Sequence, residues 1–396
     1  MYQILKGVKV IDLTTVVLGP FLTQILGDLG AEVIKVESPV GDIYRGVAPG
    51  RHPKMGAGFL NINRNKRSIV LNLKSEEGRA VFDRLINGAD VFIHNMRLSA
   101  AERLGLTYTD LAKKNASLIY CAAIGFGSKG PYADRPAYDD IIQAVSGMAH
   151  LAKNESGAPN LVPTLLGDKI GGFYALYGIL SALYYREKTG KGLSIEAPMF
   201  ESLSSFILTE HLQGQIFDEP MGTFTYKRLT NPYRRPHRTK DAYIAVMPYS
   251  YNNWKNFLTL IGREDLAAEE WLKDPSERSK RIAWLYQILD EAMMDQTTDY
   301  WLEALQRCDI PCGPVNTLDD LLMDPHLKKV SFFEKTDHPT EGLLNLTRQP
   351  VVFDGPEKTN DLPAPNHGAH TREILEQLGY SQQEIIELEK IKAISL

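Results

Sequence analysis

The sequence is poor in cysteine and has no long apolar run. Only Cys121, Cys308 and Cys312 occur in 396 residues, too few and too scattered for a disulfide framework, so we expect a reducing compartment, the cytoplasm. Cys308 and Cys312 have no second Cys or His pair nearby, so we expect no metal site. No apolar stretch reaches the roughly 18 residues that a membrane-spanning helix needs, and the first residues lack the features of a signal peptide. We therefore expect no membrane association.

Positive charge is not in excess either, and the common nucleotide and nucleophile motifs are missing. A net charge of -5 and a pI near 6.0 argue against nucleic acid as the main partner. There is no Gly-x-Ser-x-Gly elbow, no His-Glu-x-x-His pair and no Walker loop. Gly125-Phe126-Gly127 comes closest to a dinucleotide fingerprint, but the helix would have to open at Pro131, so the match is weak. A phosphorylated ligand would need scattered Lys and Arg side chains or helix N-termini.

What the sequence does have is a regular alternation of apolar runs and helix-length segments over its first 200 residues. We expect strands at residues 8–13, 31–36, 68–73, 90–94, 118–124 and 193–197. Helices are expected at 19–29, where Gly30 is placed to end the helix, and at 75–87. A further helix, buried on most sides, begins near Asp168. Strands that alternate with helices indicate βαβ units, and so an α/β fold with a doubly wound parallel sheet.

The composition changes after residue 200. Residues 231–238 contain two prolines and four basic side chains and indicate a linker or binding loop. A strand at 242–246 and tryptophan-rich helices follow, and residues 310–315 form a second crossover. The domains expected are a large domain over 1–200, a small domain over 225–320, and a segment over 330–396 that returns to the large domain with an amphipathic helix near 373–378.

Three groups of basic side chains stand out. Residues 63–68 place three cations before a strand, either in a solvated loop or in a ligand site. Arg97 and Arg103 follow another strand that ends near Asn95, and open α/β sheets bind ligands at such strand ends. The third group is Arg234, Arg235, His237 and Arg238. It is either a solvated linker or a site for an anionic acid such as a dicarboxylate.

Asp168 stands before a buried apolar helix and beside glycines, in Gly-Asp-Lys-Ile-Gly-Gly at residues 167–172. One interpretation is a helix N-cap whose oxygen accepts a backbone N–H two or three residues further on. The other is a carboxylate that the helix dipole keeps ionised, with glycines that let a ligand approach the backbone. Such a carboxylate can attack an acyl-CoA thioester. Both interpretations can hold for one residue.

The order of short motifs along the chain resembles that of the family III (class III) CoA-transferases, or CaiB/BaiF family, the group that includes formyl-CoA:oxalate transferase. The matching stretches are residues 5–14, 19–20, 29–37, 63–68, 103–106, 125–127, 130–132, 143–147, 167–168, 186–192 and 310–315. The resemblance implies an α/β fold with a Rossmann-like large domain built from both chain ends. It also implies a smaller inserted α+β domain and an interlocked homodimer.

The resemblance further implies a site. Asp168 would be the catalytic aspartate of an enzyme that moves coenzyme A from an acyl-CoA donor to a carboxylic acid acceptor. The expected reaction is a ping-pong exchange through an aspartyl anhydride and an aspartyl-CoA thioester, with oxyanion donors near Gly171 or in the 125–127 loop. Coenzyme A is then a substrate, and no cofactor is expected. The implied coenzyme A contacts are Val17, Leu18, Leu71, Asn72, Leu73, Lys74, Asn95, Met96, Arg97, Arg103, Tyr138 and Asp139.

Two departures from the family pattern leave points open. Residues 95–99 read Asn-Met-Arg-Leu-Ser where the family often has Asn-Phe-x-Pro-Gly, and no glycine run is present to close over the intermediates. The alternative function is that of the α-methylacyl-CoA racemases, which share the fold. They carry a His–Asp pair where this chain has Tyr138-Asp139. A tyrosine, with an ordinary pKa near 10, is a poor base for a carbon acid at neutral pH.

Overall fold

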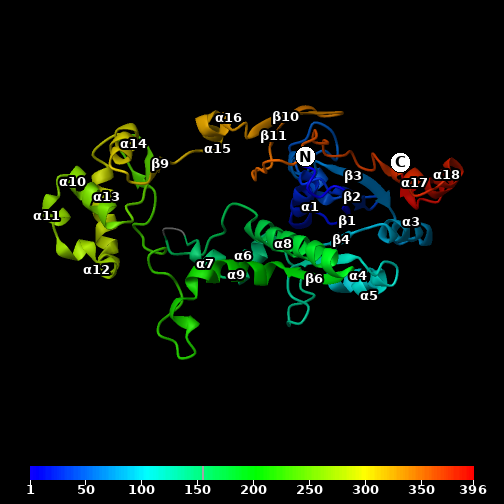
Figure 1. Ribbon diagram of the computed structural model, residues 1–396, viewed down its shortest axis with the longest axis horizontal. Helices are drawn as coiled ribbons and strands as arrows, with labels where there is room; N and C mark the ends of the chain where they lie inside the picture. The colour runs from blue at the N-terminus through cyan, green and yellow to red at the C-terminus, as the bar shows by residue number, and fades with distance from the viewer. Residues whose placement is uncertain (154–155) are drawn as a thin grey trace. The chain divides into compact units, whose positions relative to one another are not determined.

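The computed structural model describes residues 1–153 and 156–396 of the chain. They form two compact units. Unit 1 consists of Met1–Ile207 and Ser331–Leu396, and unit 2 of Leu208–Val330. Both chain ends therefore belong to unit 1, where the red C-terminal helices lie near the blue strand β3 (Figure 1).

Unit 1 is built on a seven-stranded sheet of order β12-β3-β2-β1-β4-β5-β6. Neighbouring strands are parallel except for β12, which runs antiparallel to β3 at the edge. The strands are β1 Lys9–Leu13, β2 Glu32–Glu37, β3 Lys66–Leu71, β4 Val91–His94, β5 Ile119–Ile124, β6 Leu193–Pro198 and β12 Ile394–Ser395. The order of β1 to β6 is that of Rossmann sheets, in which the direction of winding reverses between β1 and β4. The prediction of an α/β fold with a mostly parallel sheet is confirmed.

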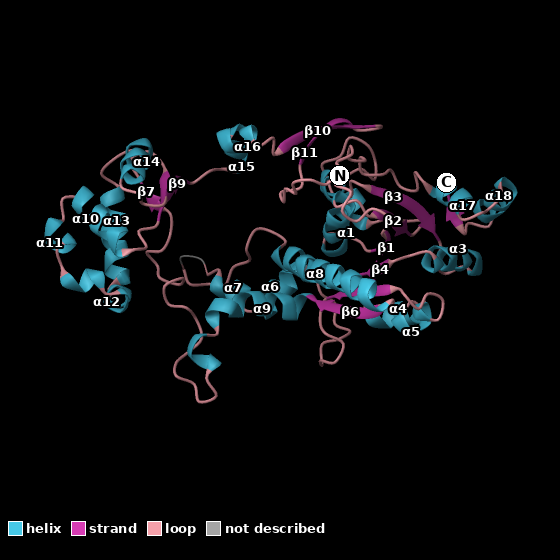
Figure 2. Ribbon diagram, viewed as in Figure 1, coloured by secondary structure: helices cyan, strands magenta, loops and turns pink. Residues whose placement is uncertain are grey.

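Helices connect consecutive strands of this sheet, and further helices follow β6 in the chain (Figure 2). Their bounds are α1 Leu18–Asp28, η1 Ile43–Gly46, α2 Ala57–Ile62, α3 Glu76–Asn87, α4 Leu98–Arg103, α5 Tyr108–Ala112, α6 Asp139–Val145, α7 Met148–Leu151, α8 Leu166–Thr189, α9 Met199–His211, α17 Thr371–Gln377 and α18 Gln382–Lys390. Local sequence explains their ends: the Ser75 side chain accepts the Gly78 N–H at the start of α3, and Gly30, with a φ of 101°, follows α1. A separate hairpin pairs β10 Phe333–His338 with β11 Gly342–Thr347. Over residues 1–153 and 156–396, no helix combines the length and apolar character that crossing a membrane requires.

The main core of unit 1 joins the two ends of the chain. Phe82 of α3 and Phe92 of β4 belong to the same buried cluster as Ile374 of α17 and Ile385 of α18. Burying one such side chain contributes roughly 1.5–3 kcal/mol. The C-terminal segment is thus held to the N-terminal sheet by apolar packing as well as by the β12–β3 pairing.

Unit 2 combines a small antiparallel sheet with helices. Its sheet has the order β7-β8-β9, with β7 His237–Arg238, β8 Tyr243–Val246 and β9 Cys312–Pro314. Its helices are η2 Gln213–Ile216, α10 Tyr251–Leu260, α11 Glu264–Ala267, η3 Glu270–Lys273, α12 Pro275–Lys280, α13 Ile282–Met293, α14 Thr298–Arg307, α15 Leu318–Met323 and α16 Pro325–Lys329. Trp254, Phe257 and Tyr286 form the centre of its core.

The expected linker or binding loop and the expected crossover of unit 2 each contain a short strand that the sequence did not predict. Residues 231–238 include β7 and residues 310–315 include β9. Each strand is too short to show an alternating pattern and exists because it pairs with β8.

Candidate active site

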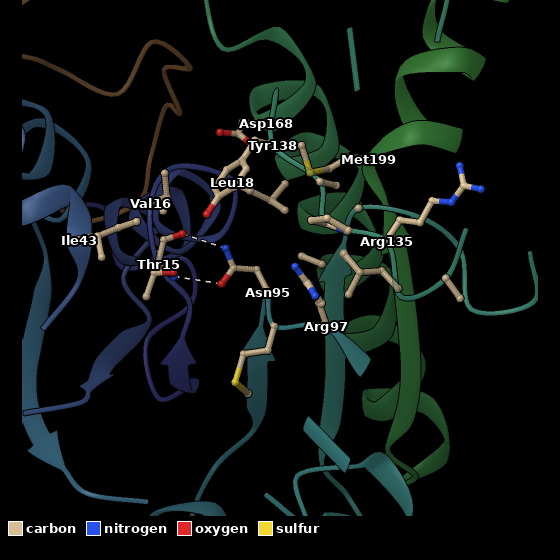
Figure 3. A pocket seen from close by; sticks show the side chains of 17 residues that line it. Thr15, Val16, Leu18, Ile43, Asn95, Arg97, Arg135, Tyr138, Asp168 and Met199 are labelled. Atoms are coloured by element: carbon tan, nitrogen blue, oxygen red, sulfur yellow. Dashed lines mark hydrogen bonds between the residues drawn. The ribbon is translucent and has the colours of Figure 1, made fainter. Parts of the chain in front are cut away.

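A cavity of about 220 Å³ opens at the carboxyl edge of the unit 1 sheet, where β1, β4 and β5 end (Figure 3). This is the point at which the strand order reverses, where open α/β sheets bind their ligands. The implied catalytic aspartate and five of the implied coenzyme A contacts line it: Asp168, Leu18, Asn95, Met96, Arg97 and Tyr138. Asp168 is the one acidic side chain among the described residues of the wall.

Asp168 lies in the first turn of α8 and is only 8% exposed. The N-cap of this helix is Leu165, so the N-cap interpretation of Asp168 is wrong. The neighbouring glycines serve helix packing. A Cβ on Gly171 would lie 3.1 Å from a methyl carbon of Leu18, and one on Gly172 would lie 3.0 Å from the Leu18 carbonyl oxygen. The start of α1 therefore fills the space that we expected a ligand to use.

A second carboxylate fixes the start of α8. Asp139, the first residue of α6, accepts the Asp168 backbone N–H at 3.1 Å, and Gln143 donates to its other oxygen at 2.6 Å. Gln143 also donates to the carbonyls of Val162 and Thr164, in the segment that leads into α8. Asp139 is 4% exposed and does not line the cavity. The structure thus places this expected coenzyme A contact behind the cavity wall.

Burial raises the pKa of Asp168 to about 7, and the nearby negative charge of Asp139 adds to the effect. The first turn of a helix favours an ionised carboxylate, but here it does not outweigh burial. The expectation that the dipole keeps Asp168 fully ionised is therefore wrong. Near pH 7 the neutral and charged forms are both populated, the condition in which active-site carboxyl groups often operate.

The turn between β1 and α1 forms one side of the cavity in a strained conformation. Val16 has a φ of 69°, in the left-handed region that β-branched residues avoid. The Asn95 amide holds this turn: it donates to the Thr15 carbonyl at 2.8 Å and accepts the Thr15 N–H at 3.0 Å (Figure 3). Asp42 accepts the Val16 N–H at 3.0 Å. Backbone strain on the order of 1–3 kcal/mol, held by its surroundings, is a feature of functional sites.

Buried ion pairs in turn hold Asp42. Lys35 donates to Asp42 at 2.9 Å and to the Thr14 carbonyl at 2.8 Å, and the side chains of this pair have no exposed surface. Glu37 accepts the Asp42 N–H and forms a bidentate pair with Arg45, with both distances 2.7 Å. Burial acts to raise the pKa of Glu37, but the hydrogen bonds and positive charges of Arg45 and Lys35 outweigh it and hold the pKa at about 2.

The basic segment 63–68 is not a solvated loop, which corrects that interpretation, and it does not line this cavity. Arg64 is buried and forms a bidentate pair with Asp28 at 2.9 and 2.6 Å. Lys66 is buried 3.3 Å from Asp12, and burial lowers its pKa to about 7 despite that carboxylate. These cations build the interior of unit 1.

Several expected coenzyme A contacts lie away from the described wall of this cavity. They are Val17, Leu71, Asn72, Leu73, Lys74, Arg103 and Asp139. Val17 is buried at the start of α1, and Arg103 is exposed at the end of α4. Leu71 is the last residue of β3, which lies two places from β1 in the sheet, and it pairs with Ile394 of β12. Residues 72–74 follow it directly.

The wall also contains residues that the sequence interpretation missed. They are Thr15, Val16, Ile43, Arg135 and Met199, beside smaller residues of the 123–137 segment. Arg135 lies eleven positions after the end of β5, too far along the loop for a rule based on the residues directly after a strand to select it. Its guanidinium stacks 4.0 Å from the centre of the Tyr132 ring. Arg97 and Arg135 give the cavity a positive charge suited to an anionic ligand.

Two of the expected oxyanion donors, the N–H groups of Gly127 and Gly171, are already used. The Gly127 N–H donates to Glu201 at 3.0 Å, and Gly171 lies inside α8, where its N–H belongs to the helix ladder. Neither can bind an oxyanion in this conformation. Among the residues that the structure describes, no group of three or more His, Cys, Asp or Glu side chains is arranged to hold a metal ion.

Comparison with known proteins identifies the family. Residues 5–371 match the model of CoA-transferase family III. The chain is 33% identical to succinyl-CoA:glutarate CoA-transferase of Homo sapiens, covering 97% of this chain and 88% of that protein. It is also 33% identical to cinnamoyl-CoA:phenyllactate CoA-transferase of Clostridium sporogenes, covering 98% of this chain and 97% of that protein. The crystal structure of a CaiB/BaiF family protein from Brucella suis matches with a TM-score of 0.80 and 31% identity over 96% of this chain and all of that one.

The chain therefore belongs to CoA-transferase family III, as the order of its motifs predicted. It is an enzyme that transfers coenzyme A.

Proposed function

We propose that the enzyme moves coenzyme A from an acyl-CoA to a carboxylic acid in a ping-pong reaction with Asp168 as the nucleophile. One observation carries this proposal. Asp168 is the only carboxylate in the described wall of a cavity at the strand-order reversal, and no Ser, Cys, Lys or His side chain lines that wall. Arg97 and Arg135 supply positive charge for the phosphates of coenzyme A. The coenzyme A thioester is a substrate, and the reaction needs no further cofactor.

Each step exchanges one acyl bond for another. The Asp168 carboxylate attacks the donor thioester, which forms an aspartyl–acyl anhydride and releases the coenzyme A thiolate. The thiolate attacks the Asp168 carbonyl carbon, which forms an aspartyl-CoA thioester and releases the donor acid. The acceptor carboxylate then attacks this thioester to give a second anhydride, and the thiolate takes the acceptor acyl group and restores Asp168. No water is consumed, so the free energy of the thioester is retained in the product.

The geometry gives the racemase alternative little support. A racemase needs a base on each face of the substrate α-carbon. Tyr138 is 65% exposed, and the carboxylate of Asp139 is buried and accepts hydrogen bonds from Asp168 and Gln143. Within the described wall, Asp168 has no second carboxylate or imidazole beside it.

An exchange assay tests the function. The purified protein is given acetyl-CoA or succinyl-CoA with a panel of isotope-labelled carboxylic acids, and the products are followed by mass spectrometry. We expect labelled acyl-CoA from the accepted acid in the same amount as the donor acid released. Release of coenzyme A without an acceptor would indicate a thioester hydrolase, and exchange of the α-proton alone a racemase. Either result contradicts the proposal.

Transfer should slow as the pH falls through about 7. The raised pKa of Asp168 means that the nucleophilic carboxylate is lost by protonation in this range, and kcat/KM for the acyl-CoA should then fall about tenfold per pH unit.

Asp139→Asn removes a negative charge that raises the pKa of Asp168, so the fall of kcat/KM at acid pH should move to lower pH. The new amide also faces the Gln143 donor, so Tm should fall. Asp140→Asn, at the exposed next position, is the matched control. The same pH dependence of kcat/KM in both variants would refute the role of Asp139.

We also propose that the enzyme is an interlocked homodimer in the cytoplasm, as the family resemblance implies. On α8, Phe173, Tyr177 and Tyr184 are 50%, 59% and 67% exposed, and apolar surface of this kind commonly marks an interface. Light scattering should give twice the chain mass of 44.4 kDa. A monomer at micromolar concentration would contradict the dimer.

A further inference from the structure

Unit 2 contains a cavity of its own, of about 450 Å³. This volume lies in the range of small-molecule sites, about 300–1,000 Å³. Much of its lining comes from β8, β9 and the residues next to them, and it is mainly apolar: Ala245, Val246, Met247, Pro311, Cys312 and Gly313. The cavity is large enough for a short organic molecule and offers it a hydrocarbon-like floor.

One edge of this cavity is basic. Arg234, Arg235 and His237 line it from β7 and the segment that precedes β7. Asp290 of α13 accepts a hydrogen bond from Arg235 at 3.0 Å, and its other oxygen lies 2.9 Å from Nδ1 of His237. Arg234 is exposed, and within the described part of the chain its guanidinium makes no hydrogen bond or ion pair.

The charges at this edge do not cancel. Asp290 compensates Arg235, and burial lowers the pKa of His237 despite the nearby Asp290 carboxylate. Arg228 adds a positive charge behind the wall, where it donates to the hydroxyl of a lining tyrosine at 3.1 Å. Arg234 remains as an uncompensated cation beside an apolar floor, an arrangement that suits an anion with a hydrocarbon body.

We propose that this cavity binds the free carboxylate of a dicarboxylic acid, with Arg234 on the carboxylate and the carbon chain on β8 and β9. A guanidinium binds a carboxylate through two parallel hydrogen bonds. Packing the carbon chain against Val246 and Met247 removes apolar surface from water, which a bare phosphate could not use. The choice of ligand rests on the proposed function, because carboxylic acids are what the enzyme then exchanges. A dicarboxylic acid offers a carboxylate to Arg234 and a carbon chain to the apolar floor of the cavity.

Calorimetric titration of the full chain with succinate, glutarate and adipate, in the absence of acyl-CoA, tests this inference. We expect at least one of the three to bind, and Arg234→Gln to weaken its binding about tenfold, because a charge-assisted hydrogen-bonded pair is lost. Arg238→Gln is the matched control. Arg238 is exposed on β7, four positions after Arg234, but does not line the cavity, so binding should change less than about twofold, the effect of a screened surface charge. The neutral diamide of the acid that binds should not bind.

Four results would overturn the inference. The first is that none of the three acids binds, and the second is equal weakening by Arg234→Gln and Arg238→Gln. The third is loss of binding in Arg97→Gln but not in Arg234→Gln. The fourth is competition by coenzyme A itself, which would assign the positive charge to phosphate binding. The titration involves no step at Asp168. Arg234-dependent binding without any transfer in the exchange assay would therefore contradict only the proposed function. Transfer with binding that does not depend on Arg234 would contradict only this inference.

Discussion

Replacing Asp168 with asparagine should abolish coenzyme A transfer and make the folded protein more stable at pH 8. The variant keeps the size of the side chain but removes the nucleophile, so we expect kcat to fall by roughly 10⁴-fold or more. Acyl exchange measured by mass spectrometry gives the loss of activity. Asp140→Asn, which changes an exposed aspartate on α6, should keep nearly full activity. If the Asp168 variant kept a tenth of the wild-type rate, Asp168 would not be the nucleophile.

The gain in stability follows from the raised pKa. In the unfolded chain Asp168 ionises with the ordinary pKa of an aspartate, whereas in the folded protein burial and Asp139 raise the pKa to about 7. The unfolded state therefore releases this proton more readily, and the folded state loses stability as the pH rises from about 4 to about 7. Each unit of the difference corresponds to about 1.4 kcal/mol. Asparagine avoids this cost, so the free energy of unfolding should rise by about 2–4 kcal/mol at pH 8 and by less at pH 5. An equal change at both pH values would contradict the raised pKa.

Arg45→Met should destabilise the protein by about 3–5 kcal/mol, the usual cost of breaking a buried ion pair by removing one partner. The side chains of Arg45 and Glu37 are each 1% exposed, and Arg45 also donates to the Pro365 carbonyl at 3.1 Å. Without Arg45, Glu37 is left buried with a weakened set of partners. Urea denaturation at pH 7 measures the effect. Arg103→Met is the control, because Arg103 is exposed and forms no ion pair among the described residues, and it should stay within about 0.5 kcal/mol of wild type.

The same substitution should impair the active site. Glu37 accepts the backbone N–H of Asp42, and Asp42 accepts that of Val16 in the strained turn beside the cavity. Arg45→Met should therefore lower kcat/KM under conditions where the variant is fully folded. Unchanged kinetics in the folded variant would show that the turn keeps its conformation without this pair.

The sheet of unit 1 could be predicted from the sequence because its signals are local. Each strand is a short apolar run bounded by turn residues, and Gly30 marks the end of α1 by the positive φ that it adopts. Asn95 and Arg97 could be placed at the cavity because they directly follow a strand, and parallel strands end at a common edge.

What the sequence could not show are pairings between distant residues. The partners Arg64 and Asp28 are 36 positions apart, and Lys66 and Asp12 are 54 apart. Nothing local separates such buried cations from a charged loop. In the same way β9 is a strand only because β8 lies beside it. The pKa of Asp168 depends on Asp139, which α6 brings from 29 residues earlier in the chain.

The most direct test of the central claim follows one oxygen atom. In the proposed reaction the acceptor carboxylate attacks the aspartyl-CoA thioester, and the bridging oxygen of the resulting anhydride stays on Asp168 when the thiolate takes the acceptor acyl group. With an acceptor acid labelled with heavy oxygen, the peptide that contains Asp168 should gain about 2 Da after one turnover, as one labelled oxygen replaces an ordinary one. No gain in mass at Asp168 while acyl exchange proceeds would contradict covalent catalysis by this residue.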